Sequence, residues 1–83
     1  MNIRQVIETR LKAALVEAGQ PVPATFDDNL VLLQTGLDSL GFAILVTQLE
    51  QELRYDPFTL MEQAVYPTTF GEFVSIYERF SPA

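Results

Sequence analysis

Apolar residues recur at three- and four-residue steps in three separate segments of this chain, a spacing that fits helices rather than strands. The first segment, residues 2–18, carries one apolar stripe: Ile3, Val6, Ile7, Leu11, Ala14, Leu15 and Ala18. Asn2 is suited to cap the start of this helix, and Gly19 fits the left-handed position after its end. Pro21 and Pro23 then prevent the helix from continuing.

A second helix is predicted over residues 39–54, with Asp38 as its N-cap. At about 100° per residue, its core-facing side holds Phe42, Leu45, Val46, Leu49 and Leu53. The opposite side holds Leu40, Ile44, Thr47 and Gln51. Leu40 and Ile44 are thus expected to point to solvent, and two apolar residues on one exposed face favour a contact surface.

A short third helix is predicted to begin at Asp56-Pro57 and to end at about Ala64. Pro67 closes the connection that follows. Thr69 and Glu72 then form the pattern of a capping box, in which each side chain satisfies the other's backbone N–H. A fourth helix is expected to run from there to about residue 80. Its inward face is predicted to hold Phe70, Phe73, Val74 and Tyr77.

Residues 20–37 form a long connection between the first two helices. This connection is rich in large apolar side chains: Phe26, Leu30, Val31, Leu32 and Leu33. We expect it to fold over the core, with a short turn after residues 27–29, and long ordered loops are often functional. The prediction is one all-α domain over residues 1–83, with three main helices, one short helix and a long first loop.

The 83 residues are enough for one domain with a modest core. The chain has neither Cys nor His. Disulfides, Cys-ligated zinc and a thiol nucleophile are therefore excluded, and the commonest general base and metal ligand are missing. Ser39 is not predicted to be a catalytic nucleophile, because no His can activate it and no Gly-x-Ser-x-Gly turn surrounds it. We expect a non-catalytic protein without a metal site.

The net charge is −6, and from Ala13 to Glu78 ten acidic residues accompany a single base, Arg54. This charge disfavours nucleic acid as a partner and favours a basic one, although solubility explains it equally well. No apolar run is long enough for a membrane span, and residues 1–5 lack the apolar core of a signal peptide. We therefore expect a cytoplasmic monomer with no membrane partner.

Gly36-Leu37-Asp38-Ser39-Leu40 lies where the long loop meets the second helix. This motif resembles the acyl carrier protein family, including the peptidyl and aryl carriers of modular synthetases. The mark of that family is Asp-Ser-Leu at the start of its second helix, usually with Gly two residues before the Asp. Length, acidity, helix pattern, Leu49-Glu50 and Tyr66-Pro67-Thr68 extend the resemblance over nearly the whole chain.

The resemblance implies an acyl-carrier-protein-like four-helix bundle with a 4′-phosphopantetheine arm on the Ser39 hydroxyl. A separate phosphopantetheinyl transferase supplies the arm from coenzyme A, and Asp38 would lie next to the metal of that enzyme. The position fits physically, because the unpaired N–H groups of a first helical turn favour a phosphodiester anion. For an isolated serine, an ordinary helix-start residue is the simpler interpretation.

By the same resemblance, the arm carries acyl or aminoacyl groups as thioesters. The implied partners are the transferase, an acyl- or aminoacyl-loading ligase, and downstream synthase or transferase enzymes. An alternative prediction is a helical protein–protein interaction adaptor that keeps the fold without any arm.

The second helix departs from the pattern of fatty-acid-synthesis carriers, which commonly place acidic residues early in this helix. Gly41 and Ile44 stand there instead, and acids appear only at Glu50 and Glu52. We therefore predict an apolar partner surface of Leu40, Ile44 and Thr47, with Glu50 acting from further away. This departure favours a specialised pathway (polyketide, nonribosomal peptide or modified lipid) over housekeeping fatty acid synthesis. Glycine inside the helix at position 41 predicts a close approach, by the arm or by a partner.

Overall fold

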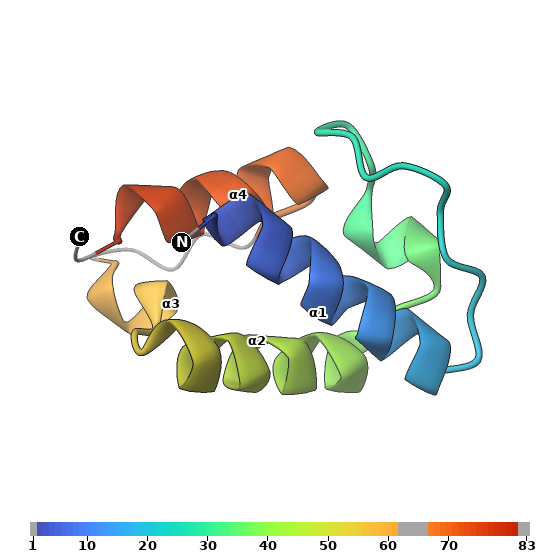
Figure 1. The fold of residues 1–83 in the computed structure, drawn as a ribbon, viewed down its shortest axis with the longest axis horizontal. Coiled ribbons are helices and arrows are strands. Elements are labelled where there is room, and N and C mark those ends of the chain that lie inside the picture. The colour runs from blue at the N-terminus through green and yellow to red at the C-terminus, as the bar shows by residue number, and fades with distance from the viewer. Residues whose placement is uncertain (1, 62–66, 82–83) are drawn as a thin grey trace.

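A computed structural model describes residues 2–61 and 67–81, which form four α-helices and no strand (Figure 1). The elements in chain order are α1 (Ile3–Glu17), the 3-10 helix η1 (Leu32–Thr35), α2 (Ser39–Leu53), α3 (Pro57–Leu60) and α4 (Phe70–Arg79). Helix α1 packs against both α2 and α4. The predicted all-α class is confirmed for the described residues. None of the helices in these two ranges is long and apolar enough to cross a membrane.

Helix α1 begins and ends as its sequence predicts. The side chain of Asn2 accepts a hydrogen bond from the backbone N–H of Gln5 at 3.1 Å. Gly19 follows the helix with a φ of 72°, and the N–H of Gln20 donates to the carbonyl of Leu15 at 2.9 Å. These bonds satisfy backbone groups that the ends of a helix leave unpaired.

The core combines the predicted inward faces of α1, α2 and α4 with side chains from the long loop. Its buried residues are Ile7, Leu11, Leu15, Phe26, Leu32, Leu37, Leu45, Leu49, Leu53, Phe70, Phe73, Val74 and Tyr77. Other predicted core residues are partly buried around it: Ile3, Val6, Ala14, Phe42 and Val46. Ala18 was predicted on the inward stripe but is exposed, because it lies beyond the last residue of α1.

Aromatic rings fill the end of the core next to α3. The ring centroid of Phe73 lies 5.3 Å from that of Phe42 and 5.2 Å from that of Tyr77. Phe58 of α3 stacks on Phe73 at 6.5 Å and meets Tyr77 edge-on at 6.0 Å. Aromatic pairs add about 0.5–1.5 kcal/mol each beyond their burial, so this packing holds the single turn of α3 in place.

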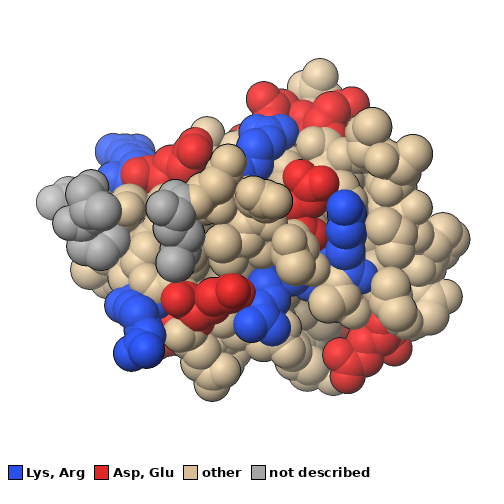
Figure 2. Space-filling model, in the orientation of Figure 1, with Lys and Arg blue, Asp and Glu red and all other residues tan. Residues whose placement is uncertain are grey.

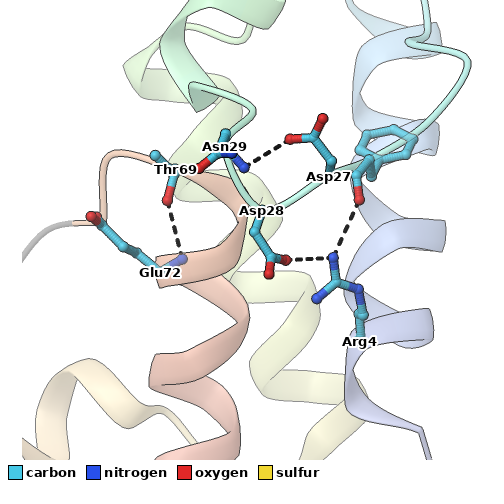
Figure 3. A network of polar contacts seen from close by, with 7 residues as sticks. Arg4, Asp27, Asp28, Asn29, Thr69 and Glu72 are labelled. Carbon is cyan, nitrogen blue, oxygen red and sulfur yellow. Dashed lines mark hydrogen bonds and ion pairs between the residues drawn. The ribbon is translucent and has the colours of Figure 1, made fainter.

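The long loop is tied to the first turn of α1. The guanidinium of Arg4 donates to the carboxylate of Asp28 at 2.6 Å and to the carbonyl of Phe26 at 3.3 Å (Figure 3). The same guanidinium lies 5.1 Å from the ring centroid of Phe70, the first residue of α4. Arg4 therefore joins the loop to two helix starts.

The loop is also bonded to the start of α4 through the backbone. The N–H of Gly71 donates to the carbonyl of Asp28 at 3.1 Å, and a Cβ on this glycine would lie 2.7 Å from the Cβ of Asp28. Leu32 N–H donates to the carbonyl of Thr68 at 3.0 Å, and Phe70 N–H donates to that of Leu30 at 2.8 Å. The predicted loop thus folds over the core, although Leu33 is exposed.

Two local predictions need correction. Helix α3 ends at Leu60 and not at about residue 64, because the backbone of Met61 is extended and cannot continue the helix; residues 62–66 lie outside the described residues. In the capping box, the Glu72 N–H does donate to the Thr69 hydroxyl at 3.2 Å. The Glu72 carboxylate, however, accepts from the N–H of Thr68 at 2.8 Å and not from that of Thr69. The extended pairing of residues 68–70 with the loop brings this earlier N–H within reach.

Two neighbouring tyrosines differ in the hydrogen bonding of their hydroxyl groups. The Tyr55 hydroxyl donates to the carbonyl of Tyr77 at 2.5 Å. The Tyr77 hydroxyl is buried and has no hydrogen-bond partner among the described residues. Burial raises the pKa of Tyr77 above its ordinary value, so this unpaired hydroxyl stays neutral.

We predict that Tyr77→Phe leaves the free energy of unfolding unchanged or raises it by up to about 1 kcal/mol, because an unsatisfied buried polar group is removed. Tyr55→Phe should instead lower it by about 0.5–1.5 kcal/mol, because a formed hydrogen bond is lost. Urea denaturation of both variants measures the two values. A larger loss in Tyr77→Phe than in Tyr55→Phe would contradict the assignment of the unpaired hydroxyl.

Candidate functional site

The motif of residues 36–40 forms the junction between η1 and α2. Gly36 ends η1 with a φ of 94°, a left-handed backbone that favours glycine. Leu37 is buried in the core, and Asp38 caps α2 from an extended backbone. Ser39 is then the first residue of α2, and its side chain is exposed. The motif therefore places one buried anchor, one cap and one exposed hydroxyl in three successive residues.

The cap leaves hydrogen-bond donors free at the start of α2. The Asp38 carboxylate accepts from the N–H of Gly41 at 2.7 Å, and its carbonyl accepts from that of Phe42 at 2.9 Å. The amides of Ser39 and Leu40 make no hydrogen bond with any part of the chain that is described. The Ser39 hydroxyl likewise has no partner in residues 2–61 and 67–81. An anion attached to this hydroxyl would meet two free N–H groups and the positive end of a 15-residue helix.

Gly41 lies close to the side chains of Leu37 and Asp38. A Cβ at this position would lie 2.8 Å from Cδ1 of Leu37 and 3.2 Å from Oδ1 of Asp38. The sequence predicted a close approach at this glycine, by an arm or by a partner, and the structure shows a close approach by the buried side chain of Leu37. The glycine therefore allows the buried leucine and the first turn of α2 to pack tightly.

The predicted partner surface lies along the solvent side of α2. Leu40 is 69% exposed and Ile44 is 48% exposed, which confirms that both point away from the core. Thr47 and Glu50 are exposed further along the helix, and the Thr47 hydroxyl donates back to the carbonyl of Ala43 at 3.0 Å. The apolar part of this surface is thus nearest to Ser39.

A groove that the sequence did not predict lies between the C-terminal half of α1 and the N-terminal half of α2. Its volume is about 240 Å³. The lining residues are Ala14, Glu17, Ala18, Asp38, Leu40, Gly41, Ile44 and Gln48. The small side chains of Ala14 and Ala18 leave this space open, and they are the signal in the sequence that could have indicated it.

A second hollow lies on the other side of α2, towards α3. It has a volume of about 260 Å³ and is lined by Phe42, Ala43, Val46 and Phe58. None of these four side chains is polar. The two hollows therefore differ in chemistry, because the α1–α2 groove includes carboxylate and carboxamide groups.

Ion pairs within the chain occupy the basic residues of α1. Arg4 pairs with Asp28 and Arg10 pairs with Glu52, both at 2.6 Å, and Lys12 lies 3.5 Å from Glu8. On the face drawn in Figure 2, acidic and basic side chains accordingly lie next to one another. Glu17 and Glu50 have no ion pair within residues 2–61 and 67–81. These two carboxylates remain available to a basic partner near the exposed face of α2.

Comparisons of this chain with family models, with curated proteins and with solved structures found no match.

We predict that Gly41→Ala lowers the free energy of unfolding by about 1 kcal/mol, although alanine normally favours a helix interior by about that amount. The physical reason is the added Cβ, which would lie 2.8 Å from a side-chain atom of buried Leu37. Thermal and urea denaturation measure the change.

The control for this prediction is a double-mutant cycle. In a Leu37→Val background the close Cδ1 atom is absent, and Gly41→Ala should then be neutral or stabilising. Equal losses in both backgrounds would show that the contact with Leu37 is not the reason for the glycine.

Proposed function

We propose that this chain is a non-catalytic carrier protein, with Ser39 as the attachment site of a 4′-phosphopantetheine arm. The observation that carries the proposal is the exposed, unpaired Ser39 hydroxyl at the first residue of α2, within the motif Gly36-Leu37-Asp38-Ser39-Leu40. The arrangement of the described residues supports it. Three longer helices, a one-turn α3 and a long first loop are what an acyl-carrier-protein-like bundle requires.

The surroundings of Ser39 fit the arm. The hydroxyl is open to another protein's active site, and nothing in the described residues competes for it. The free amides of Ser39 and Leu40 would face the negative phosphodiester, and the adjacent Asp38 remains engaged as the cap of α2. The residues at this junction therefore bind and orient the group without any change in the fold.

Attachment is a transfer of one phosphoryl-linked group from coenzyme A. The Ser39 oxygen forms a bond to the phosphorus that bears the pantetheine, while the diphosphate P–O bond of coenzyme A breaks. Adenosine 3′,5′-bisphosphate leaves, and the hydroxyl proton passes to a base of a separate phosphopantetheinyl transferase. The chain itself supplies the acceptor oxygen and no base, which agrees with its lack of His. The attached arm supplies a thiol that carries an acyl or aminoacyl group as a thioester.

The exposed face of α2 supports partners that bind mainly through apolar contact. Leu40 and Ile44 lie within two turns of Ser39, whereas the unpaired carboxylate of Glu50 lies three turns away. The Glu52 carboxylate is already paired with Arg10. A loading ligase and a downstream synthase would thus meet an apolar centre with charge at its edge, which favours a specialised pathway over housekeeping fatty acid synthesis.

We predict that the purified chain, incubated with coenzyme A, Mg²⁺ and a promiscuous phosphopantetheinyl transferase, gains about 340 Da, the mass of one phosphopantetheinyl group. Intact-protein mass spectrometry measures the gain, and peptide fragmentation should place it on Ser39.

Ser39→Ala is the control, because this exposed residue can lose its hydroxyl without disturbing the core. The variant should fold as the parent chain does and gain no mass. Full loading of Ser39→Ala would overturn the site. No loading of the parent chain would instead favour the armless adaptor.

We further predict that Leu40→Gln and Ile44→Gln each lower kcat/KM for loading by about 10-fold, a loss that corresponds to about 1.4 kcal/mol of apolar contact. Leu60→Gln is the matched control, because Leu60 is also exposed but lies in α3, at the opposite end of α2 from Ser39 (Figure 1). Equal rates for all three variants would exclude Leu40 and Ile44 from the transferase contact.

A further inference from the structure

Two rows of side chains bound the α1–α2 groove. On α2, the residues Leu40, Ile44 and Gln48 follow one another at four-residue spacing, so they form one ridge along the helix. On α1, the row beside the groove contains Ala14 and Ala18, whose side chains are too short to fill the space between the helices. An unfilled row next to such a ridge is the shape that receives the i, i+4 ridge of another helix.

The groove has a defined end and a defined length. One turn beyond Gln48 and Ala14, the ion pair of Arg10 with Glu52 joins the two helices at 2.6 Å. From Leu40 to Gln48 the helix α2 rises by about 12 Å along its axis. The volume of about 240 Å³ lies below the range of about 300–1,000 Å³ that is usual for a small-molecule site. The groove therefore suits two side chains of a short helical segment better than a whole small ligand.

The charged groups that line the groove are acidic. The Glu17 carboxylate is exposed and has no ion pair within residues 2–61 and 67–81, whereas the Asp38 carboxylate is held as the cap of α2. No Lys or Arg is among the described residues that line the groove. Arg10, one turn before Ala14 on α1, is already paired with Glu52. Apolar walls with one free carboxylate complement a segment that carries apolar side chains next to a Lys or Arg.

Ser39 faces a different side of α2 from the groove. At about 100° per residue, Leu40, Ile44 and Gln48 lie about 100°, 140° and 180° around the helix from Ser39. The ridge of Leu40 and Ile44 therefore separates a helix bound in the groove from the Ser39 hydroxyl. Binding in the groove and access to Ser39 are compatible for this reason.

We infer that the α1–α2 groove binds an amphipathic helix of a partner protein. Two apolar side chains of that helix, four residues apart, contact Leu40 and Ile44 above the short side chains of Ala14 and Ala18, and a Lys or Arg beside them pairs with Glu17. This inference extends the partner surface from α2 to α1, and it does not depend on the attachment of any arm. In the proposed carrier, such a partner holds the chain while the arm reaches an active site.

The probe for the test is a capped helical peptide of about 15 residues made of Leu, Lys and Ala, with leucines four residues apart and lysines beside them. It is titrated into the unloaded chain, so the outcome is independent of the arm, and the backbone amide NMR signals are followed. We expect saturable shifts at Ala14, Gly41 and Ile44, with one peptide bound per chain. No saturable shift at about 1 mM peptide, or shifts centred on Phe42 and Phe58 of the other hollow, would overturn the inference.

A pair of charge variants separates the groove from the general acidity of the chain. Glu17→Gln should weaken binding of the peptide by about 2- to 5-fold, as expected for the loss of an exposed ion pair. Glu50→Gln removes another unpaired carboxylate, which does not line the groove, and it should leave the Kd unchanged. Equal losses in the two variants would show that the peptide responds to net charge alone, which contradicts the inference.

A second pair of variants tests the open space. Ala18→Leu places a larger side chain in the groove and should weaken binding by about 10-fold or more. Ala13→Leu makes the same change at a position of α1 that does not line the groove, and its Kd should stay within about 2-fold of the parent value. Both positions are exposed, so both variants should keep the Tm of the parent chain. Binding that survives in Ala18→Leu, or that is lost equally in both variants, would rule out the groove as the site.

Discussion

The burial of Leu37 determines where α2 begins and what Ser39 faces. This side chain is 3% exposed, and it packs so near the first turn of α2 that a Cβ at position 41 would lie 2.8 Å from its Cδ1. With Leu37 fixed in the core, the next residue caps the helix and the one after it must project outward. The exposed hydroxyl is therefore a consequence of a core contact two residues earlier. A serine at the same helix position without that anchor would be free to fray with its helix end.

The long loop contributes to the site by holding Leu37 in place from a distance. Arg4 binds the loop to α1 through an ion pair. The backbone of Phe70 and Gly71 binds the loop to α4, and the buried side chain of Phe26 belongs to the core. Loop segments usually retain mobility because few of their groups are buried or bonded. Here the backbone and apolar side chains are anchored to two helices before η1 leads into Gly36. The position of Ser39 thus depends on residues that lie far from it in sequence.

The sequence predicted the helices well because their caps and stripes are local signals. The three predicted N-caps are confirmed: Asn2 caps α1, Asp38 caps α2 and Asp56 caps α3. The capping box at Thr69 was only half right, since the partner of Glu72 depends on the pairing of residues 68–70 with the distant loop. The α1–α2 groove was missed for the same reason. Two alanines at the end of α1 and a glycine of α2 line this groove, and only tertiary packing brings them to one place.

The count of acidic residues in the sequence overstates the number of carboxylates that are free to bind a basic partner. Asp28 and Glu52 belong to ion pairs with arginines of α1, although the sequence places those bases far away. Asp27, Asp38 and Asp56 each accept a backbone N–H, and their carboxylates serve local turns and caps. The unpaired Glu17 and Glu50 remain on the two helices that form the site. Glu17 lines the groove, and Glu50 lies three turns from Ser39. If the chain is the carrier we propose, these carboxylates would attract a basic partner from the edge of the site, and apolar contact with α2 would decide how long a partner stays.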